Sequence, residues 1–201
     1  RSLCHSSIRV EENQNIRNSA FLHIQQLLRV PTRSKTSHVM INTAVAFIVY
    51  KRPDTTRRVF ETIRQARPPR LYLIADGPKT ADLEPKCQEV RQIVENGIDW
   101  DCELRPVYSD KNLGLARRVQ TGLNEVFAQE EAAIILEDDT LPHASFFPYC
   151  QELLERYSED ERIAHVSGCN PHPEASSERS SYCFSSIFNV WGWATWRRAW
   201  K

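Results

Sequence analysis

The chain has 201 residues, with 26 Lys or Arg against 26 Asp or Glu, and 41% of the residues are hydrophobic. This length fits one domain whose core needs no disulfide or metal ion to fold. The formal net charge of zero argues against a dedicated nucleic-acid-binding protein, because phosphate contacts require an excess of basic residues. The longest apolar run, residues 43–50, is too short to span a membrane.

The cysteines are scattered, without a CxxC pair or a regular spacing. This pattern predicts free thiols in a reducing compartment, with disulfides as the alternative. We therefore expect a cytoplasmic protein, or one that attaches peripherally to a membrane. The six cysteines are Cys4, Cys87, Cys102, Cys150, Cys169 and Cys183.

Residues 1–39 differ in composition from the rest of the chain. They combine Ser, Arg, Asn and Gln with one apolar cluster at 20–28, whose spacing predicts a short amphipathic helix. Met40 is the only methionine and stands just before the first convincing strand. We expect residues 1–39 to be a tail outside the fold, either upstream of a natural start at Met40 or an ordinary N-terminal extension. Residues 40–201 then form one domain.

From residue 43 onward, apolar β-type runs alternate with helical patterns. Because strands separated by helices form βαβ units, we predict an α/β fold with a mostly parallel central sheet flanked by helices. In such sheets, ligands bind beyond the carboxyl ends of the strands. In chain order, we predict strand 44–50, helix 55–66, strand 71–74, helix 84–96, strand 102–108, helix 115–129, strand 132–136, helix 146–157 and strand 163–167.

Three acidic residues, Glu137, Asp138 and Asp139, directly follow the apolar run 132–136. Carboxylates this close repel one another and raise each other's pKa unless a cation lies among them. Mg²⁺ and Mn²⁺ prefer oxygen ligands and keep open positions for a diphosphate. The triplet therefore predicts a divalent metal site, and an acidic first turn of a helix is the ordinary alternative.

Polar residues also follow the other predicted strands. Tyr50 and Arg52 offer an aromatic ring and a cation, which suit a nucleobase and a phosphate, or simply form a solvated strand end. Asp76 either accepts from a nucleobase N–H or belongs to an Asp-Gly turn. Asn112 and Arg117 flank a Gly-containing loop before a helix N-terminus, which either binds an anion or is a plain helix start.

These motifs, in this order, resemble the nucleotide-sugar-binding half of the A-type glycosyltransferase fold, which is nucleotide-diphospho-sugar transferase-like. The Glu-Asp-Asp triplet is similar to the DxD-equivalent motif of inverting N-acetylglucosaminyltransferases and their family 2-like bacterial relatives. The segment 187–196 resembles the Gly-Trp segment of that family. The segments that carry the resemblance are 44–53, 74–77, 112–117, 135–139 and 187–196.

The resemblance implies a metal-dependent, inverting transfer of a sugar from a nucleoside diphosphate sugar, most simply a UDP-sugar, to a carbohydrate or lipid-linked acceptor hydroxyl. Asp139 would coordinate Mn²⁺ or Mg²⁺, Glu137 would approach the donor sugar, and Asp138 would approach the ribose or the sugar. Tyr50 and Arg52 would line the nucleotide site.

The resemblance also assigns the remaining positions. Asp76 would contact the base, Asn112 and Arg117 would bind the donor, and the donor sugar and acceptor would be bordered by Trp191, Gly192 and Trp193. The general base of this family is a carboxylate after the Gly-Trp segment, and no Asp or Glu follows Glu178. We therefore expect the base beyond Lys201, in a domain truncated at its C-terminus with an incomplete acceptor part.

The tryptophans near the end of the chain allow two interpretations. Trp193, Trp196 and Trp200 recur at helical spacing, which is typical of a packed helix face. Packing is favoured for Trp196 and Trp200, whereas Trp191 and Trp193 are equally compatible with stacking on a sugar ring. Residues 171–181, rich in Ser and Glu, predict a surface loop or a lid over the site.

Two other functions compete with a glycosyltransferase. A non-catalytic nucleotide- or glycan-binding fragment is favoured by the missing downstream carboxylate. A nucleotidyltransferase on a similar sheet is disfavoured, because the first strand leads into Tyr50 and Arg52 without the glycine-rich loop of those enzymes.

Overall fold

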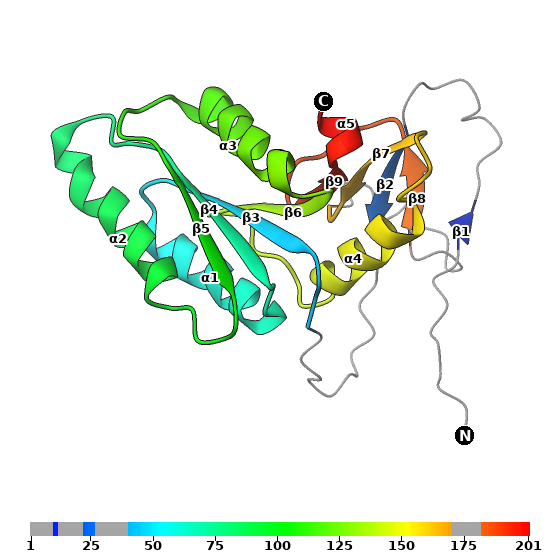
Figure 1. Ribbon diagram of the computed structural model, residues 1–201, viewed down its shortest axis with the longest axis horizontal. Helices are drawn as coiled ribbons and strands as arrows, with labels where there is room; N and C mark the ends of the chain where they lie inside the picture. Colours follow the sequence, from blue (N-terminus) through cyan, green and yellow to red (C-terminus); the bar gives the residue numbers. More distant parts are fainter. Residues whose placement is uncertain (1–9, 12–21, 27–39, 170–181) are drawn as a thin grey trace.

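Figure 1 shows the computed structural model of the chain, which describes residues 10–11, 22–26, 40–169 and 182–201. The strands of these residues are β1 (Val10–Glu11), β2 (Leu22–Gln26), β3 (Ala44–Val49), β4 (Arg70–Ala75), β5 (Glu103–Tyr108), β6 (Ala132–Glu137), β7 (Ile163–Ser167), β8 (Tyr182–Ser185) and β9 (Trp193–Trp196). The helices are α1 (Pro53–Ala66), the short 3₁₀ helix η2 (Ala81–Leu83), α2 (Glu84–Glu95), α3 (Leu115–Gln129), α4 (Phe146–Arg156) and α5 (Arg197–Trp200).

The strands form one sheet in the order β1-β8-β2-β7-β9-β6-β3-β4-β5. The pairs β6·β3, β3·β4 and β4·β5 are parallel, as is β2·β7, whereas β9 runs antiparallel to both β6 and β7. The predicted α/β fold with a mostly parallel central sheet flanked by helices is confirmed by this pairing. Strand β5 lies at one edge of the sheet, which explains why it tolerates Pro106, a residue without a ladder N–H.

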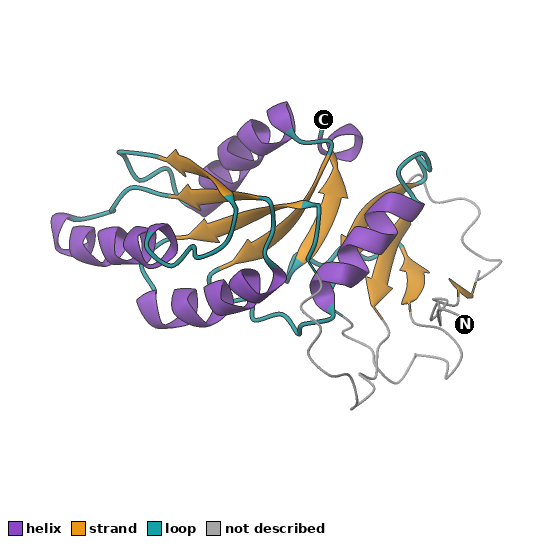
Figure 2. Ribbon diagram, turned by 60° about the horizontal axis from the view of Figure 1, so that its bottom comes forward, coloured by secondary structure: helices purple, strands orange, loops and turns teal. Residues whose placement is uncertain are grey.

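Helices cover both faces of the sheet (Figure 2). Helices α1, α2 and α4 pack on one face, where alternate β3 residues such as Phe47 are fully buried. Helix α3 packs on the other face, against Ile48 and its neighbours. Because strand β3 is covered on both sides, all six of its residues are apolar and buried.

Two predictions for residues 1–39 are wrong where the structure describes them. The backbone of Leu22–Gln26 is a strand rather than part of a helix, and it pairs with β7 and β8. Val10–Glu11 pairs with β8, so these two segments belong to the sheet and not to a tail. Pairing on both sides satisfies the backbone of β2, and such tertiary contacts override local helical spacing. The predicted loop at 171–181 lies outside the described residues.

The tryptophan run is also not one helix face. Trp193–Trp196 is strand β9, and only Trp200 lies in helix α5. Residues three apart in a strand point to opposite faces, so Trp193 joins the core under α3 and Trp196 joins the core under α1, α2 and α4. The predicted packing of Trp196 and Trp200 is confirmed.

The five cysteines within the described residues, all but Cys4, are unpaired, as predicted. Within the same residues, no helix combines the length and the apolar character that crossing a membrane would require.

Candidate functional site

The carboxyl ends of β3, β4, β5 and β6 meet at one edge of the sheet, because these four strands are parallel neighbours. The connections that leave this edge carry Tyr50 and Arg52, Asp76, Asn112, and the triplet 137–139. Hydrogen bonds join all of these connections, so the edge is one continuous polar network.

Asp138 is the buried centre of the acidic triplet, with 2% of its surface exposed. Its Oδ1 accepts from Nε and Nη2 of Arg52 at 2.9 and 2.5 Å. Its Oδ2 accepts from the backbone N–H of Tyr50 at 3.2 Å. The carboxylate therefore joins the end of β6 to the connection between β3 and α1.

Arg52 also contacts the third acid of the triplet. Its Nη1 lies 2.8 Å from Oδ2 of Asp139, whose side chain is 49% exposed. One guanidinium thus offsets the negative charges of two neighbouring carboxylates. It supplies the cation that carboxylates this close together require. The sequence placed Arg52 near the phosphates but did not predict this pairing.

The protonation of the triplet reflects both burial and charge. Burial raises the pKa of Glu137 above its ordinary value, and the charges of Asp139 and Asp138 raise it further. Burial also raises the pKa of Asp138, against the opposing effect of the Arg52 hydrogen bond and charge. Glu137 is thus the acid of the triplet that Arg52 compensates least.

Asp76, 5% exposed, anchors the loop between β5 and α3. Its oxygens accept from the backbone N–H groups of Leu113 (2.9 and 3.1 Å), Gly114 (3.0 Å) and Gly77 (3.0 Å) and from Nδ2 of Asn112 (3.1 Å). These donors fill the lone pairs of the carboxylate. A nucleobase N–H would have to displace one of them. In the structure, Asp76 stabilises the loop before α3, a role that the sequence did not predict.

The Tyr50 hydroxyl connects three of the loops. It accepts from the backbone N–H of Lys79 at 3.0 Å and from Nδ2 of Asn112 at 3.3 Å. The Asn112 amide also donates to the carbonyl of Gly77 at 2.9 Å. Tyr50 and Asn112, predicted separately as ligand-binding residues, therefore lie together at the edge.

The loop before α3 leaves its helix end accessible. Gly114 has a φ of 77° and no side chain caps the helix there. A Cβ at Gly114 would meet no atom within 4 Å, so the surroundings are open. Arg117 is exposed in the first turn of α3.

The segment before β9 approaches the triplet from the other side. The Gly192 carbonyl accepts from the Gly168 N–H at 2.8 Å, and a Cβ at Gly192 would lie 3.3 Å from Thr140, just after the triplet. Trp191 is 63% exposed, whereas Trp193 is only 6% exposed. Trp191 is therefore available to a ligand, while little of the Trp193 ring is.

His165, which was not among the predicted site residues, supports this segment together with Phe188 from the segment itself. The His165 ring stacks on Trp193 with centroids 5.0 Å apart and lies 4.1 Å from the Phe188 ring. Its Nε2 is 2.8 Å from the carbonyl oxygen of Asn189. A histidine inside a strand gave no signal, because its partners come from a distant part of the chain.

The donor set at the triplet fits a divalent ion only with help from a ligand. No group of three or more His, Cys, Asp or Glu that could hold a metal occurs within the residues that the structure describes. Asp138 is buried and held by Arg52 and Tyr50, and Glu137 is partly buried. Asp139 also pairs with Arg52, but its side chain is 49% exposed, which makes it the most accessible carboxylate of the triplet. Mg²⁺ and Mn²⁺ are commonly held by one or two carboxylates, water and substrate phosphates, and Asp139 fits that arrangement.

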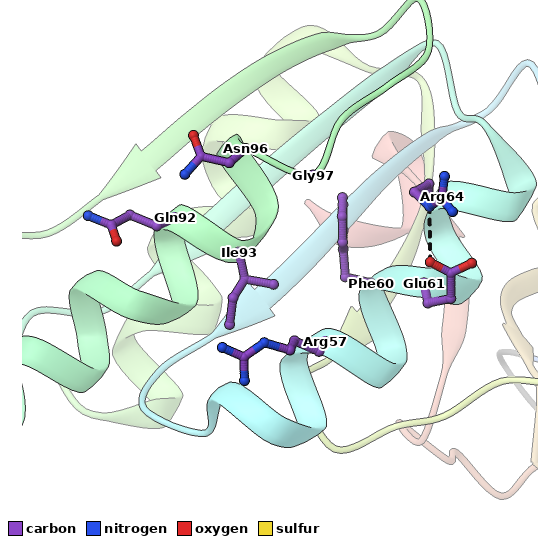
Figure 3. A pocket seen from close by; sticks show the side chains of 8 residues that line it. All are labelled: Arg57, Phe60, Glu61, Arg64, Gln92, Ile93, Asn96 and Gly97. Carbon is purple, nitrogen blue, oxygen red and sulfur yellow. Dashed lines mark hydrogen bonds and ion pairs between the residues drawn. The ribbon is translucent and has the colours of Figure 1, made fainter.

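A groove of about 390 Å³ lies between α1 and α2 and includes none of the predicted site residues (Figure 3). Phe60, Ile93 and Gly97 contribute to its lining. Its arginines are paired with acids, Arg57 with Glu89 at 2.6 Å and Arg64 with Glu61 at 2.9 Å. This groove is therefore separate from the candidate site.

The comparisons with known proteins add little to this geometry. No family model and no curated protein matches the sequence. A solved structure of 4-diphosphocytidyl-2C-methyl-D-erythritol synthase from Anaerococcus prevotii is similar at 11% identity and a TM-score of 0.41, over 78% of this chain and 72% of that one. At this level, the fold assignment depends on the strand order and pairing described above.

Proposed function

We propose that the carboxyl edge of the sheet binds a nucleoside diphosphate sugar and that the protein transfers the sugar to an acceptor hydroxyl, with inversion and with a divalent metal ion. The observation that supports this proposal is the network at the edge. It brings Tyr50, Arg52 and Asn112 within hydrogen-bonding reach of one another or of the triplet 137–139. The sequence motifs resemble those of A-type glycosyltransferases in the same order.

Each part of the edge has a chemical task in this proposal. The Tyr50 ring supplies an apolar face for the base, and Arg52 and Arg117 supply cations for the diphosphate. The N-terminus of α3 adds backbone N–H groups, whose positive dipole end favours an anion. Glu137 faces the sugar, and the exposed Trp191 borders it.

Asp139 would hold the metal ion together with the diphosphate. When bound, such an ion stabilises the charge that develops on the leaving diphosphate and orients it. The chain's own residues contribute before that step, because Asp138 fixes Arg52 and Asp76 fixes the loop at 112–114. The donor thus meets a site in which Arg52 and the loop before α3 are already in position.

The experiment that tests the proposal is a calorimetric titration of the protein with UDP and with GDP, each with and without Mn²⁺. We expect binding that requires Mn²⁺ and that is lost in Asp139→Ala. The matched control is Asp54→Ala, because the Asp54 side chain is fully exposed in the first turn of α1. Unchanged binding in Asp139→Ala would reject the metal assignment.

A second assay separates an enzyme from a binding module. The same protein is incubated with UDP-N-acetylglucosamine or other nucleotide sugars, and the release of UDP is measured. Release that depends on Mn²⁺ and on Asp139 supports a transferase. Tight nucleotide binding without release supports the non-catalytic alternative. In a separate incubation with a nucleoside triphosphate and a sugar phosphate, formation of a nucleotide sugar supports a nucleotidyltransferase.

A further inference from the structure

The guanidinium of Arg52 is divided between two acids of unequal exposure. Its Nε and Nη2 are held by Asp138, which is 2% exposed and is also fixed by the Tyr50 N–H. Its Nη1 pairs with Asp139, which is 49% exposed. Separating Arg52 from Asp138 would leave a buried carboxylate without its counter-charge, which is costly. The pair with Asp139 is the exposed, weaker one.

We propose that Asp139 is a two-position carboxylate that exchanges Arg52 for the metal ion, and that this exchange couples metal binding to diphosphate binding. This inference rests on the proposed function and concerns the regulation of the same site. Without a ligand, Asp139 stays on Nη1 of Arg52. When Asp139 turns to the ion, Arg52 remains on Asp138 and its Nη1 loses its partner.

A diphosphate can replace Asp139 as the partner of Nη1 of Arg52. Arginine forms strong, directional hydrogen bonds to phosphate oxygens, so a diphosphate beside the triplet gives Nη1 a new anionic partner. The ion alone must displace a cation from Asp139, and the diphosphate alone must approach an acidic triplet. Each therefore binds better when the other is present, and the coupling is reciprocal. The site consequently takes up the ion and the diphosphate together.

Arg52→Lys separates this exchange from simple loss of charge. A lysine ammonium is a compact point charge that can remain on Asp138, but it lacks the fork that reaches both acids at once. Asp139 is then unpaired before any ligand arrives. The matched control is Arg57→Lys on the same helix, since Arg57 pairs with Asp54 and Glu89 instead.

The test is a calorimetric titration of Mn²⁺ alone, UDP alone and Mn²⁺ in the presence of UDP, for wild type, Arg52→Lys and Arg57→Lys. In Arg52→Lys, we expect Mn²⁺ alone to bind about two- to fivefold more tightly, which corresponds to the loss of one exposed ion pair. The factor by which UDP strengthens Mn²⁺ binding should fall correspondingly. Arg57→Lys should match the wild type. Arg52→Gln repeats the comparison if thermal melting shows that Arg52→Lys is unfolded.

The outcomes distinguish this inference from the proposed function. Wild-type binding of Mn²⁺ with UDP, together with unchanged Mn²⁺ affinity in both Arg52 variants, overturns the exchange and leaves the proposed function intact. Absence of Mn²⁺ binding to the wild type and to both variants, even with UDP, overturns the metal-dependent function and the exchange with it.

Discussion

The backbone N–H of Tyr50 donates to Oδ2 of Asp138 at 3.2 Å, which ties the end of β3 to the residue that follows β6. Oδ1 of the same carboxylate accepts from Arg52. Asp138 therefore joins the ends of two neighbouring parallel strands at the point where the ligand is proposed to bind. Its charge is compensated within the protein.

Asp138→Ala should destabilise the fold by about 1–3 kcal/mol, because it leaves the Tyr50 N–H and the Arg52 guanidinium without their acceptor. Because the Arg52 side chain is half exposed, water offsets part of the lost interaction, and we expect a value in the lower part of this range. Urea denaturation measures the change in unfolding free energy. Asp54→Ala, an exposed acid on α1, is the control and should unfold like the wild type. Equal stability of the two variants would contradict the structural role of Asp138.

Asp76→Ala should loosen the loop before α3. The backbone N–H groups of Leu113 and Gly114 lose their acceptor, so we expect a loss of stability of about 1–3 kcal/mol. Their amide hydrogen exchange should accelerate more than that of the α3 interior. Asp110→Ala changes an exposed acid in the same loop and should leave both amides protected. If both amides stay protected in Asp76→Ala, another group holds the loop.

The alternation of strands and helices was readable from the sequence because burial imposes it. Strand β3 is apolar throughout, since helices cover both of its faces, and helix α1 repeats its buried residues at helical spacing. Strand β2 was not readable, because its partners β7 and β8 follow far along the chain. Trp193 and Trp196 imitate helical spacing, although they face opposite sides of the sheet.

The candidate site shows the same division between regular elements and loops. Parallel strands bring their carboxyl ends to one edge, so the sequence could predict that Arg52, Asp76 and the acidic triplet lie near one another. It could not predict that Arg52 pairs with both Asp138 and Asp139, or that Asp76 is filled by loop N–H groups. Those contacts depend on the conformations of the loops, which no periodic pattern specifies.

Glu137 should make the stability of the protein depend on pH. Burial, and then the charges of Asp139 and Asp138, raise its pKa in the folded state. A carboxyl with a raised folded pKa stabilises the protein at low pH, and this contribution is lost as pH rises through that folded pKa. Glu137→Gln removes the charge, so its melting temperature at pH 7 should exceed that of the wild type by about 1–2 °C.

The difference should shrink as the pH falls below the ordinary range for a glutamate, where the wild-type side chain is protonated in both states. Thermal melts across this pH range measure it. Glu159→Gln is the control, because Glu159 is exposed after α4. A constant difference between Glu137→Gln and the wild type at every pH would show that packing, rather than charge, causes the change.

Substitutions of Trp191 and Trp193 should have separate effects, one on ligand binding and the other on stability. Trp193 is 6% exposed and packs against His165 and Trp200, so Trp193→Ala should cost about 3–5 kcal/mol of unfolding free energy. Trp191 is 63% exposed, so Trp191→Ala should melt like the wild type. If its ring borders the donor sugar, Trp191→Ala should weaken binding of UDP-N-acetylglucosamine about two- to tenfold while UDP binding stays the same. Equal losses for both ligands would place Trp191 at the nucleotide, and no loss for either would remove it from the site.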